Sequence, residues 1–250
     1  CCLNYKNVLY PLEAITLGTI KYGDSSLIAS CYTKQHGLQS YILKGILTSR
    51  VNKKISKSLF EPLNLLELEA PKNSSNRLGY IKEAKIDIHY SSIPFDLRKK
   101  ALIFFLAEVI HQVVKEEHEA NQELYVFFKE KLLWLDNHQN ISLFHVKMML
   151  DLTRFIGFYP NTNNSSDSFF DLESGCMSSI KPYGKYIEGK IKKLWFCILG
   201  MKFENISSIN ITKENKKILL NSVVNYYEIH LQQFKPPKST EILNEIFRSA

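Results

Sequence analysis

Residues 14–43 read AITLGTIKYGDSSLIASCYTKQHGLQSYIL, and this stretch indicates the fold of the first part of the chain. Within residues 27–32 the apolar side chains recur at every second position, which is the period of a half-buried strand. Turn residues flank this run, with Gly-Asp at 23–24 and His-Gly at 36–37. The stretch therefore predicts three antiparallel strands joined by tight turns.

The two-residue period continues to about residue 90. Residues 65–69 and 84–89 alternate in the same way, and residues 71–79 (PKNSSNRLG) have the composition of a loop between them. A longer basic connection separates the third strand from the fourth. Five short strands with this spacing suit a small closed barrel, and the oligonucleotide/oligosaccharide-binding (OB) fold is the first candidate.

After Pro94 the pattern changes to the 3.6-residue period of amphipathic helices. The sequence predicts helices over residues 95–117, 122–135, 143–158, 184–199, 213–234 and 240–248, and a turn-rich loop insertion over 161–182. We therefore expect an α+β chain of an all-β and an all-α domain. The OB-fold barrel occupies residues 1–90, and the α-helical domain occupies residues 91–250.

The composition is that of a folded globular protein. Of 250 residues, 45% are hydrophobic and 23% are charged, so enough apolar surface is available to offset chain entropy. No apolar run is long enough to span a membrane, and the start lacks a signal-peptide pattern. Five scattered cysteines without a Cys-x-x-Cys pair are typical of a reducing cytosol, so we expect a cytoplasmic protein.

The positive charge is concentrated near the start of the chain. Residues 1–60 hold eight basic and two acidic side chains, whereas residues 61–250 hold 24 basic and 23 acidic ones. A localised excess of this kind favours an anionic partner for the predicted barrel. Nucleic acid is the first candidate, and an anionic membrane surface is the second.

A basic segment at residues 44–57 carries most of this charge. It contains no acidic residue and five cations, which are Lys44, Arg50, Lys53, Lys54 and Lys57. Such cations can neutralise phosphates and release counterions. Aromatic side chains lie on or beside the preceding strands, where they can stack on unpaired bases or complete the barrel core: Tyr22, Tyr32, His36 and Tyr41.

Patterns typical of enzymes are missing. The chain has no Gly-x-Ser-x-Gly turn, no Walker loop and no Gly-x-Gly-x-x-Gly. A single Glu-x-x-His, at Glu108 and His111, falls short of the set that a di-iron bundle requires. We therefore expect neither catalysis nor a cofactor or metal site.

Several segments resemble the RecO family of bacterial DNA repair proteins, in its Bacteroidetes-type form. They are LGTIKYGDSSLIASCYTKQHGLQSYILKG at 17–45, LLEL at 65–68, IKEA at 81–84, LTRFIGFYP at 152–160 and FDLESG at 170–175. The segments occur in the family's order and span nearly the whole chain.

The resemblance implies an OB barrel, a helical domain and a non-enzymatic recombination mediator associated with the nucleoid. Such a protein binds single- and double-stranded DNA, anneals complementary strands and, with RecR, helps load RecA onto strands coated by the single-stranded-DNA-binding protein SSB. By position, the DNA path would be lined by Lys21, Lys34, Lys44, Arg50, Lys53 and Lys54. With neighbouring side chains, the candidate DNA-binding set is Lys21, Tyr22, Lys34, His36, Lys44, Arg50, Lys53, Lys54, Lys57 and Arg154.

Arg154 matches the arginine of the family's helix-ending motif. Three roles are open for it: a DNA contact, a partner contact, or buried hydrogen bonds between helices. Two departures from the family are visible. Some members carry a four-cysteine zinc site in the region that matches 161–182, where this chain has only Cys176, so we expect no zinc. The arginines that often follow Lys-Gly in the family are replaced by cations several residues later.

The mechanism that we favour is charge neutralisation, which lets two strands pair without fuel. The acidic, hydrophobic tail of SSB would need an apolar groove with nearby cations between the C-terminal helices. Two other functions remain open: an RNA-binding OB module, and a scaffold that recruits partners without annealing strands. Whether a RecF-like protein is also required, and how RecA is reached, stays open as well.

Overall fold

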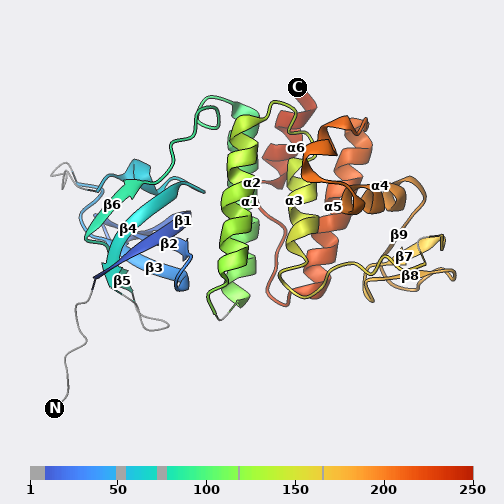
Figure 1. Cartoon of the computed structure of the whole chain (residues 1–250), viewed down its shortest axis with the longest axis horizontal. Helices are drawn as coiled ribbons and strands as arrows, with labels where there is room; N and C mark the ends of the chain where they lie inside the picture. The colour runs from blue at the N-terminus through green and yellow to red at the C-terminus, as the bar shows by residue number, and fades with distance from the viewer. Residues whose placement is uncertain (1–8, 49–54, 72–77, 118, 165, 250) are drawn as a thin grey trace, which may run out of the picture. The chain divides into compact units, whose positions relative to one another are not determined.

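The computed structural model describes residues 9–48, 55–71, 78–117, 119–164 and 166–249, which form two compact units. The first unit comprises residues 1–96 and 106–137, and the second comprises residues 97–105 and 138–250. Figure 1 labels their strands and helices. In the part of the chain that is described, no helix is both long and apolar enough to cross a membrane.

The first unit holds the predicted strands. Its elements are β1 (Leu9–Tyr22), β2 (Ser26–Thr33), β3 (Gly37–Leu43), the 3-10 helix η1 (Lys57–Phe60), β4 (Leu65–Pro71), β5 (Gly79–Tyr80), β6 (Glu83–Ile86), the end of α1 (Leu97–Glu116) and α2 (Gln122–Asn137). The strands form one sheet in the order β5-β3-β2-β1-β4-β6. The two edge strands β5 and β6 follow one another directly in the chain, so the sheet curls into a half-barrel.

Strand β1 explains how the sheet curls. Its residues 9–15 pair with β4, and its residues 14–22 pair with β2, so one strand serves both sides of the barrel. A β-bulge between Thr16 and Gly18 bends the strand where it changes partner. Gly18 has a φ of 151°, which L-residues rarely adopt. The half-barrel followed by helices confirms the predicted α+β class.

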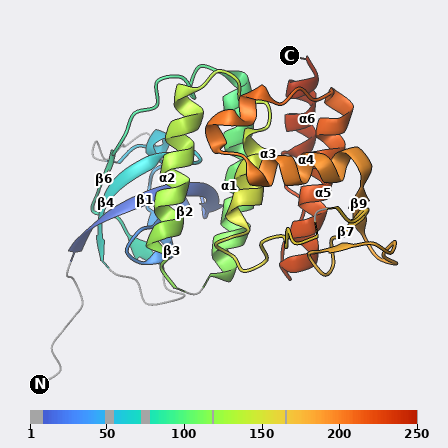
Figure 2. The same ribbon diagram turned by 45° about the vertical axis from the view of Figure 1, so that its right-hand side comes forward.

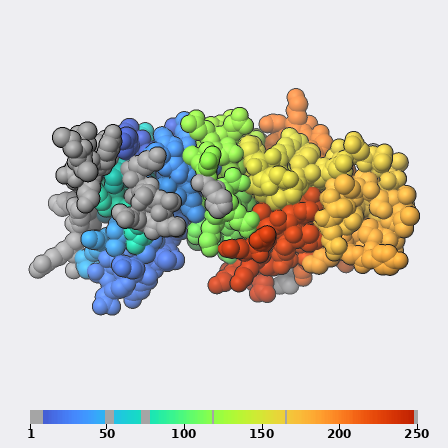
Figure 3. All heavy atoms as spheres, turned by 90° about the horizontal axis from the view of Figure 1, so that it is seen from below, coloured from blue at the N-terminus to red at the C-terminus, as the bar shows by residue number. Residues whose placement is uncertain are grey.

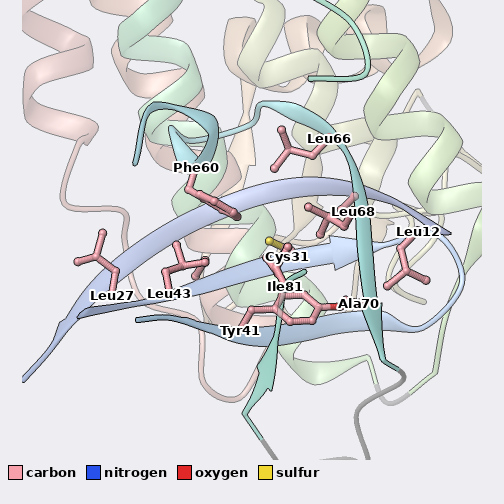
Figure 4. Packing of buried hydrophobic residues seen from close by; sticks show 12 residues of the cluster. Leu12, Leu27, Cys31, Tyr41, Leu43, Phe60, Leu66, Leu68, Ala70 and Ile81 are labelled. Carbon is pink, nitrogen blue, oxygen red and sulfur yellow. The ribbon is translucent and has the colours of Figure 1, made fainter. Parts of the chain in front are cut away.

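The barrel interior is filled by the alternating side chains (Figure 4). Leu27, Cys31 and Leu43 point inward together with Phe60 of η1, and all four are at most 6% exposed. Tyr41 is fully buried in this cluster, and burial raises the pKa of its hydroxyl well above the usual value. Because it belongs to the core, Tyr41 presents no ring to a ligand at the surface.

Helix α2 belongs to the same unit as the barrel. The buried ring of Tyr32 on β2 stacks on Tyr125 at 6.4 Å between centroids and meets Phe128 edge-on at 5.8 Å. Lys129 pairs with Asp87 at 2.7 Å and with Glu13 at 3.4 Å. These contacts explain why the compact unit does not end at residue 90, the division expected from the change of sequence period.

The second unit is mainly helical. It contains the start of α1, α3 (Phe144–Leu152), β7 (Phe169–Asp171), β8 (Cys176–Ser178), β9 (Tyr186–Glu188), α4 (Gly189–Gly200), the 3-10 helix η2 (Phe203–Ser208), α5 (Lys213–His230) and α6 (Thr240–Ser249). Helix α4 runs across α3 and α5 (Figure 2). The buried Trp195 of α4 donates its indole N–H to the Ser222 hydroxyl of α5 at 2.8 Å.

Helices α3 and α4 are shorter than the sequence predicts. The helix expected over 143–158 ends at Leu152, where the Thr153 hydroxyl donates to the Leu150 carbonyl and the chain continues in three-residue turns. The helix expected over 184–199 begins only at Gly189, because residues 186–188 pair with β7 as a strand. Neither the hydrogen bond of a single hydroxyl nor the pairing of a three-residue strand leaves a trace in hydrophobic periodicity.

Strands β7 and β8 lie inside the interval 161–182, for which the sequence predicts a loop. The sheet has the order β8-β7-β9 with three residues in each strand, too few to show a two-residue period. Aromatic packing holds it to the helices: Phe170 is fully buried against Trp195 at 5.6 Å and Phe196 at 5.3 Å. On α5, His230 places Nε2 2.9 Å from the Leu172 carbonyl oxygen.

His145 on α3 makes the stability of the chain sensitive to mild acid. It is fully buried between the rings of Phe105 and Phe247, and burial, assisted by the charge of Lys216, lowers its pKa from 6.5 to about 3. The unfolded state therefore takes up this proton first, and stability falls as pH drops below 6.5. At pH 5 the loss is about 2 kcal/mol.

Between pH 6.5 and 5 the unfolded state binds up to one proton more than the folded state, at the imidazole of residue 145. His145→Phe removes this difference, so the slope of the unfolding free energy against pH is expected to decrease by the amount that corresponds to about one proton. Chemical denaturation at several pH values measures this slope. The exposed His138, in the same unit, provides His138→Phe as the matched replacement of a histidine by phenylalanine. An unchanged slope in His145→Phe would contradict the assignment.

Candidate nucleic-acid interface

Three of the predicted residues lie at one end of the barrel. Lys21 and Tyr22 end β1, and Lys44 follows directly after β3. The register Lys21↔Leu27↔Leu43 places these strand ends side by side, two strand spacings or about 10 Å apart. Both lysines are exposed, and Tyr22 is 50% exposed. We call this end of the barrel the basic end; it comprises Lys21, Tyr22 and Lys44 together with the groove that Lys57 and Tyr80 line.

A groove of about 710 Å³ opens at the basic end. It is lined by the two exposed cations Lys44 and Lys57 and by the apolar and aromatic side chains of Ile42, Leu78 and Tyr80. Tyr80 is 45% exposed and pairs with Ile42, because β5 joins β3 in parallel. Flat rings beside cations are the elements with which proteins hold single strands.

Tyr80 is a candidate that the sequence alone does not predict. Residues 42 and 80 are far apart in the chain, and only the parallel β3–β5 pairing brings this ring to Lys44. The signal in the sequence that could have indicated Tyr80 as a surface ring is its position directly before Ile81, since neighbouring residues of a strand point to opposite faces.

Lys34 and His36 lie elsewhere on the barrel. They follow the other end of β2, about 20 Å from the basic end at 3.3 Å per residue. Lys34 is bound to Glu13 at 2.5 Å, and this contact, against the cost of burial, lowers the pKa of Glu13. The His36 ring meets Tyr10 edge-on at 6.3 Å. The structure therefore does not bring these two residues together with Lys21 and Lys44.

Strands β4 and β6 present a surface of paired charges. Glu67 and Glu69 of β4 and Glu83 of β6 line a groove of about 900 Å³ together with Glu13. Two cations are bound to its carboxylates: Lys85, which also lines the groove, lies 2.6 Å from Glu67, and Lys82 lies 3.3 Å from Glu69. These pairs balance the charge on this face, so it lacks the excess of cations found at the basic end.

The remaining candidates have separate outcomes. Arg50, Lys53 and Lys54 lie outside the described residues. Arg154 is exposed in the second unit, where its guanidinium donates to the Tyr159 hydroxyl at 2.9 Å and lies 4.7 Å from the centre of that ring. This exposure fits a surface contact better than buried hydrogen bonds between helices.

The described residues contain no group of three or more His, Cys, Asp or Glu side chains that could hold a metal ion. Glu108 and His111 lie on α1, and burial, with a smaller contribution from Lys115, lowers the pKa of His111. Burial likewise raises the pKa of Cys31 to about 12, so this thiol stays protonated.

Comparison with known proteins gives the family. Family models described as "Recombination protein O N terminal" and "Recombination protein O C terminal" match residues 9–88 and 94–241. The chain belongs to the RecO family. The match to the N-terminal family model ends at residue 88 and the match to the C-terminal one begins at residue 94, close to the division at residue 90 that the sequence predicts. The compact units of the structure are divided differently, because α2 belongs to the same unit as the barrel.

Curated RecO proteins match over nearly their whole length. The DNA repair protein RecO of Flavobacterium psychrophilum is 36% identical over 236 residues, which are 94% of this chain and 98% of that protein. The RecO of Christiangramia forsetii is 34% identical over 240 residues, and that of Bacteroides fragilis is 32% identical over 245 residues. Both cover 96% of this chain and 100% of the relative. The matches confirm the resemblance seen in the sequence.

Proposed function

We propose that this protein is a cytoplasmic, nucleoid-associated recombination mediator that binds single- and double-stranded DNA and anneals complementary strands. The observation that carries the proposal is the basic end of the barrel, where Lys21, Lys44 and Lys57 accompany the exposed rings of Tyr22 and Tyr80. Membership of a family of DNA repair proteins supports DNA as the ligand. Catalysis is not part of the proposal.

The proposed mechanism is electrostatic. Cations at the basic end neutralise phosphates of two strands, which lowers their repulsion and raises their local concentration. Complementarity is read by the strands themselves, so the protein needs no base-specific contacts. On the face of β4 and β6 the lysines Lys82 and Lys85 are paired with carboxylates, so this face offers phosphates no comparable site. With RecR, the protein would then help load RecA onto SSB-coated strands.

A groove in the second unit suits the acidic, hydrophobic tail of SSB. It encloses about 460 Å³ and combines the cations Arg98, Lys213 and Lys216 with apolar side chains that include Ile211 and Phe247. Its lining includes no carboxylate. Burial, together with the charge of Lys213, lowers the pKa of Lys216, and a bound carboxylate would relieve this cost. We propose this groove as the docking site for the tail.

Lys216→Glu is expected to weaken binding of a synthetic SSB tail peptide at least tenfold, since it replaces a charge-assisted contact by repulsion. Fluorescence anisotropy of the labelled peptide measures the effect. Lys217 is exposed and does not line the groove, so Lys217→Glu is the matched control. Lys216→Met keeps the packing against Phe247 and separates loss of charge from loss of fold. Equal affinities for all four proteins would contradict the assignment.

The experiment for the annealing activity uses bare complementary DNA strands with two fluorophores, without ATP. Wild-type protein is expected to accelerate annealing and to bind DNA at least as well as RNA of the same sequence. An RNA-binding module would prefer RNA and leave DNA annealing unchanged. A pure scaffold would bind its partners without accelerating DNA annealing. Either of these two results would overturn the proposal.

A further inference from the structure

The segment from the β8–β9 loop to the first turn of α4 carries a second concentration of positive charge. Residues 179–193 contain five lysines and one acidic residue, Glu188, although residues 61–250 as a whole are nearly neutral. Lys192 is buried and donates to the Asp167 carbonyl. The other four lysines are exposed: Lys181, Lys185, Lys190 and Lys193. A field of this sign and position attracts an anion to the second unit itself.

Two large apolar side chains stand on the same loop. Tyr183 is fully exposed, and Ile180 is 78% exposed. The β7–β9 sheet forms part of the solvent-facing yellow and orange surface in the space-filling view (Figure 3). The grooves described above do not include either side chain. Tyr183 is therefore a projecting ring on the loop that also carries the exposed Lys181 and Lys185.

The loop is held in place at both ends. The Ser178 hydroxyl accepts the Ile180 N–H at 3.2 Å, and the Leu172 N–H donates to the Lys185 carbonyl at 2.9 Å. Gly184 packs against the Glu173 carboxylate so closely that a Cβ atom there would lie 2.2 Å from an oxygen. Pro182 restricts the backbone directly before Tyr183. A ring that is presented by an ordered loop loses little entropy when a ligand stacks on it.

We propose that the β8–β9 loop (residues 179–185) is a second contact for single-stranded nucleic acid. A base stacks on Tyr183, and phosphates on either side pair with Lys181, Lys190 and Lys193. Charge complementarity selects an anionic ligand, and a flat ring on a projecting loop suits a base, which has two open faces. An acidic peptide would share the charge but would also need a groove for its side chains. The inference rests on the proposed function for the class of ligand, but it concerns a different site.

The first test is cross-linking of the full chain to single-stranded DNA that contains 5-iododeoxyuridine. Irradiation followed by mass spectrometry should find a cross-link at Tyr183 in addition to any at Tyr80 or Tyr22. Cross-links at the barrel alone would overturn the second contact while leaving the proposed function intact. Absence of any binding would instead overturn the proposed function.

The second test measures affinity in a background where the barrel is weakened by Lys21→Glu, Lys44→Glu and Lys57→Glu. In this background Tyr183→Ser is expected to reduce binding of oligo(dT) about tenfold, whereas Tyr183→Phe keeps the stacking and the affinity. Phe95 is 85% exposed in the first unit, so Phe95→Ser is the matched control. Equal affinity of the Tyr183→Ser and Phe95→Ser proteins would overturn the proposal.

The third test addresses the lysines. Alanine at Lys181, Lys190 and Lys193 should lower the dependence of log K on log salt by about 2, at roughly 0.7 for each single-strand phosphate. An unchanged slope, or an acidic peptide that binds the loop while oligo(dT) does not, would overturn the proposal in favour of a protein partner.

Discussion

The variant Lys21→Glu, Lys44→Glu and Lys57→Glu is expected to bind single-stranded DNA about 100-fold more weakly than wild type at 0.1 M salt. Each phosphate contact adds roughly 0.7 to the dependence of log K on log salt, so three contacts are worth about two decades at this concentration. The slope itself should fall by about 2, and the difference between the proteins should disappear near 1 M salt. Titration of a labelled oligo(dT) at several salt concentrations measures both quantities.

A charge-matched control separates the position of the lysines from their number. Lys82, Lys85 and Lys115 are exposed residues of the same unit, and reversing all three changes the net charge by the same amount. This control should keep most of the wild-type affinity, because two of its lysines are bound to Glu69 and Glu67. Equal losses in the two variants would mean that only the overall charge matters.

The variant Asp136→Ala is expected to destabilise the chain by about 3 kcal/mol and to lower Tm by roughly 6–12 °C. Asp136 is 7% exposed at the end of α2. Its carboxylate accepts the backbone N–H groups of Ser91, Ser92 and Ile93 at 2.8–2.9 Å. Alanine leaves these donors without their acceptor, in the segment that follows the barrel. Thermal and chemical unfolding followed by circular dichroism measures the loss.

The pH dependence of this loss has a definite sign. Burial alone would raise the pKa of Asp136, but the N–H groups outweigh it and lower the pKa from 3.8 to about 2. The contribution is therefore complete above pH 3.8 and disappears as pH falls through 2. Glu130→Ala removes an exposed carboxylate of the same helix and should change stability by less than about 0.5 kcal/mol. A similar loss in both variants would contradict the role of Asp136.

The fold was predictable where an element is long enough for its apolar side chains to show the period of a strand or of a helix. The strand pattern of residues 14–43 and the helical stripe of α1 both match the structure, because burial of one face imposes the period of the element on the sequence. The β7–β9 sheet was not predictable in this way. Its strands have three residues each, and aromatic contacts of Phe170 with α4 hold it in place.

The candidate site was predictable only in part. Lys44 and Lys57 were predicted from the charge of their segment and Lys21 from the family resemblance, and the structure places all three at the same end of the barrel. Lys34 carries the same charge, yet Glu13 binds it, and this pairing depends on the register between β1 and β2. Tyr80 could be assigned to the site only from the structure, because the parallel β3–β5 pairing places it next to Ile42. Local composition thus predicts the kind of ligand, whereas tertiary pairing decides which residues can reach it.

The most direct test of the account is annealing of two complementary, fluorophore-labelled DNA strands coated with cognate SSB, without ATP. Wild-type protein and the Lys82/Lys85/Lys115 charge-reversal control should both accelerate annealing. The Lys21/Lys44/Lys57 charge-reversal variant, verified as folded, should not. Acceleration by all three proteins would contradict the placement of DNA at the basic end, and acceleration by none would contradict the annealing activity itself.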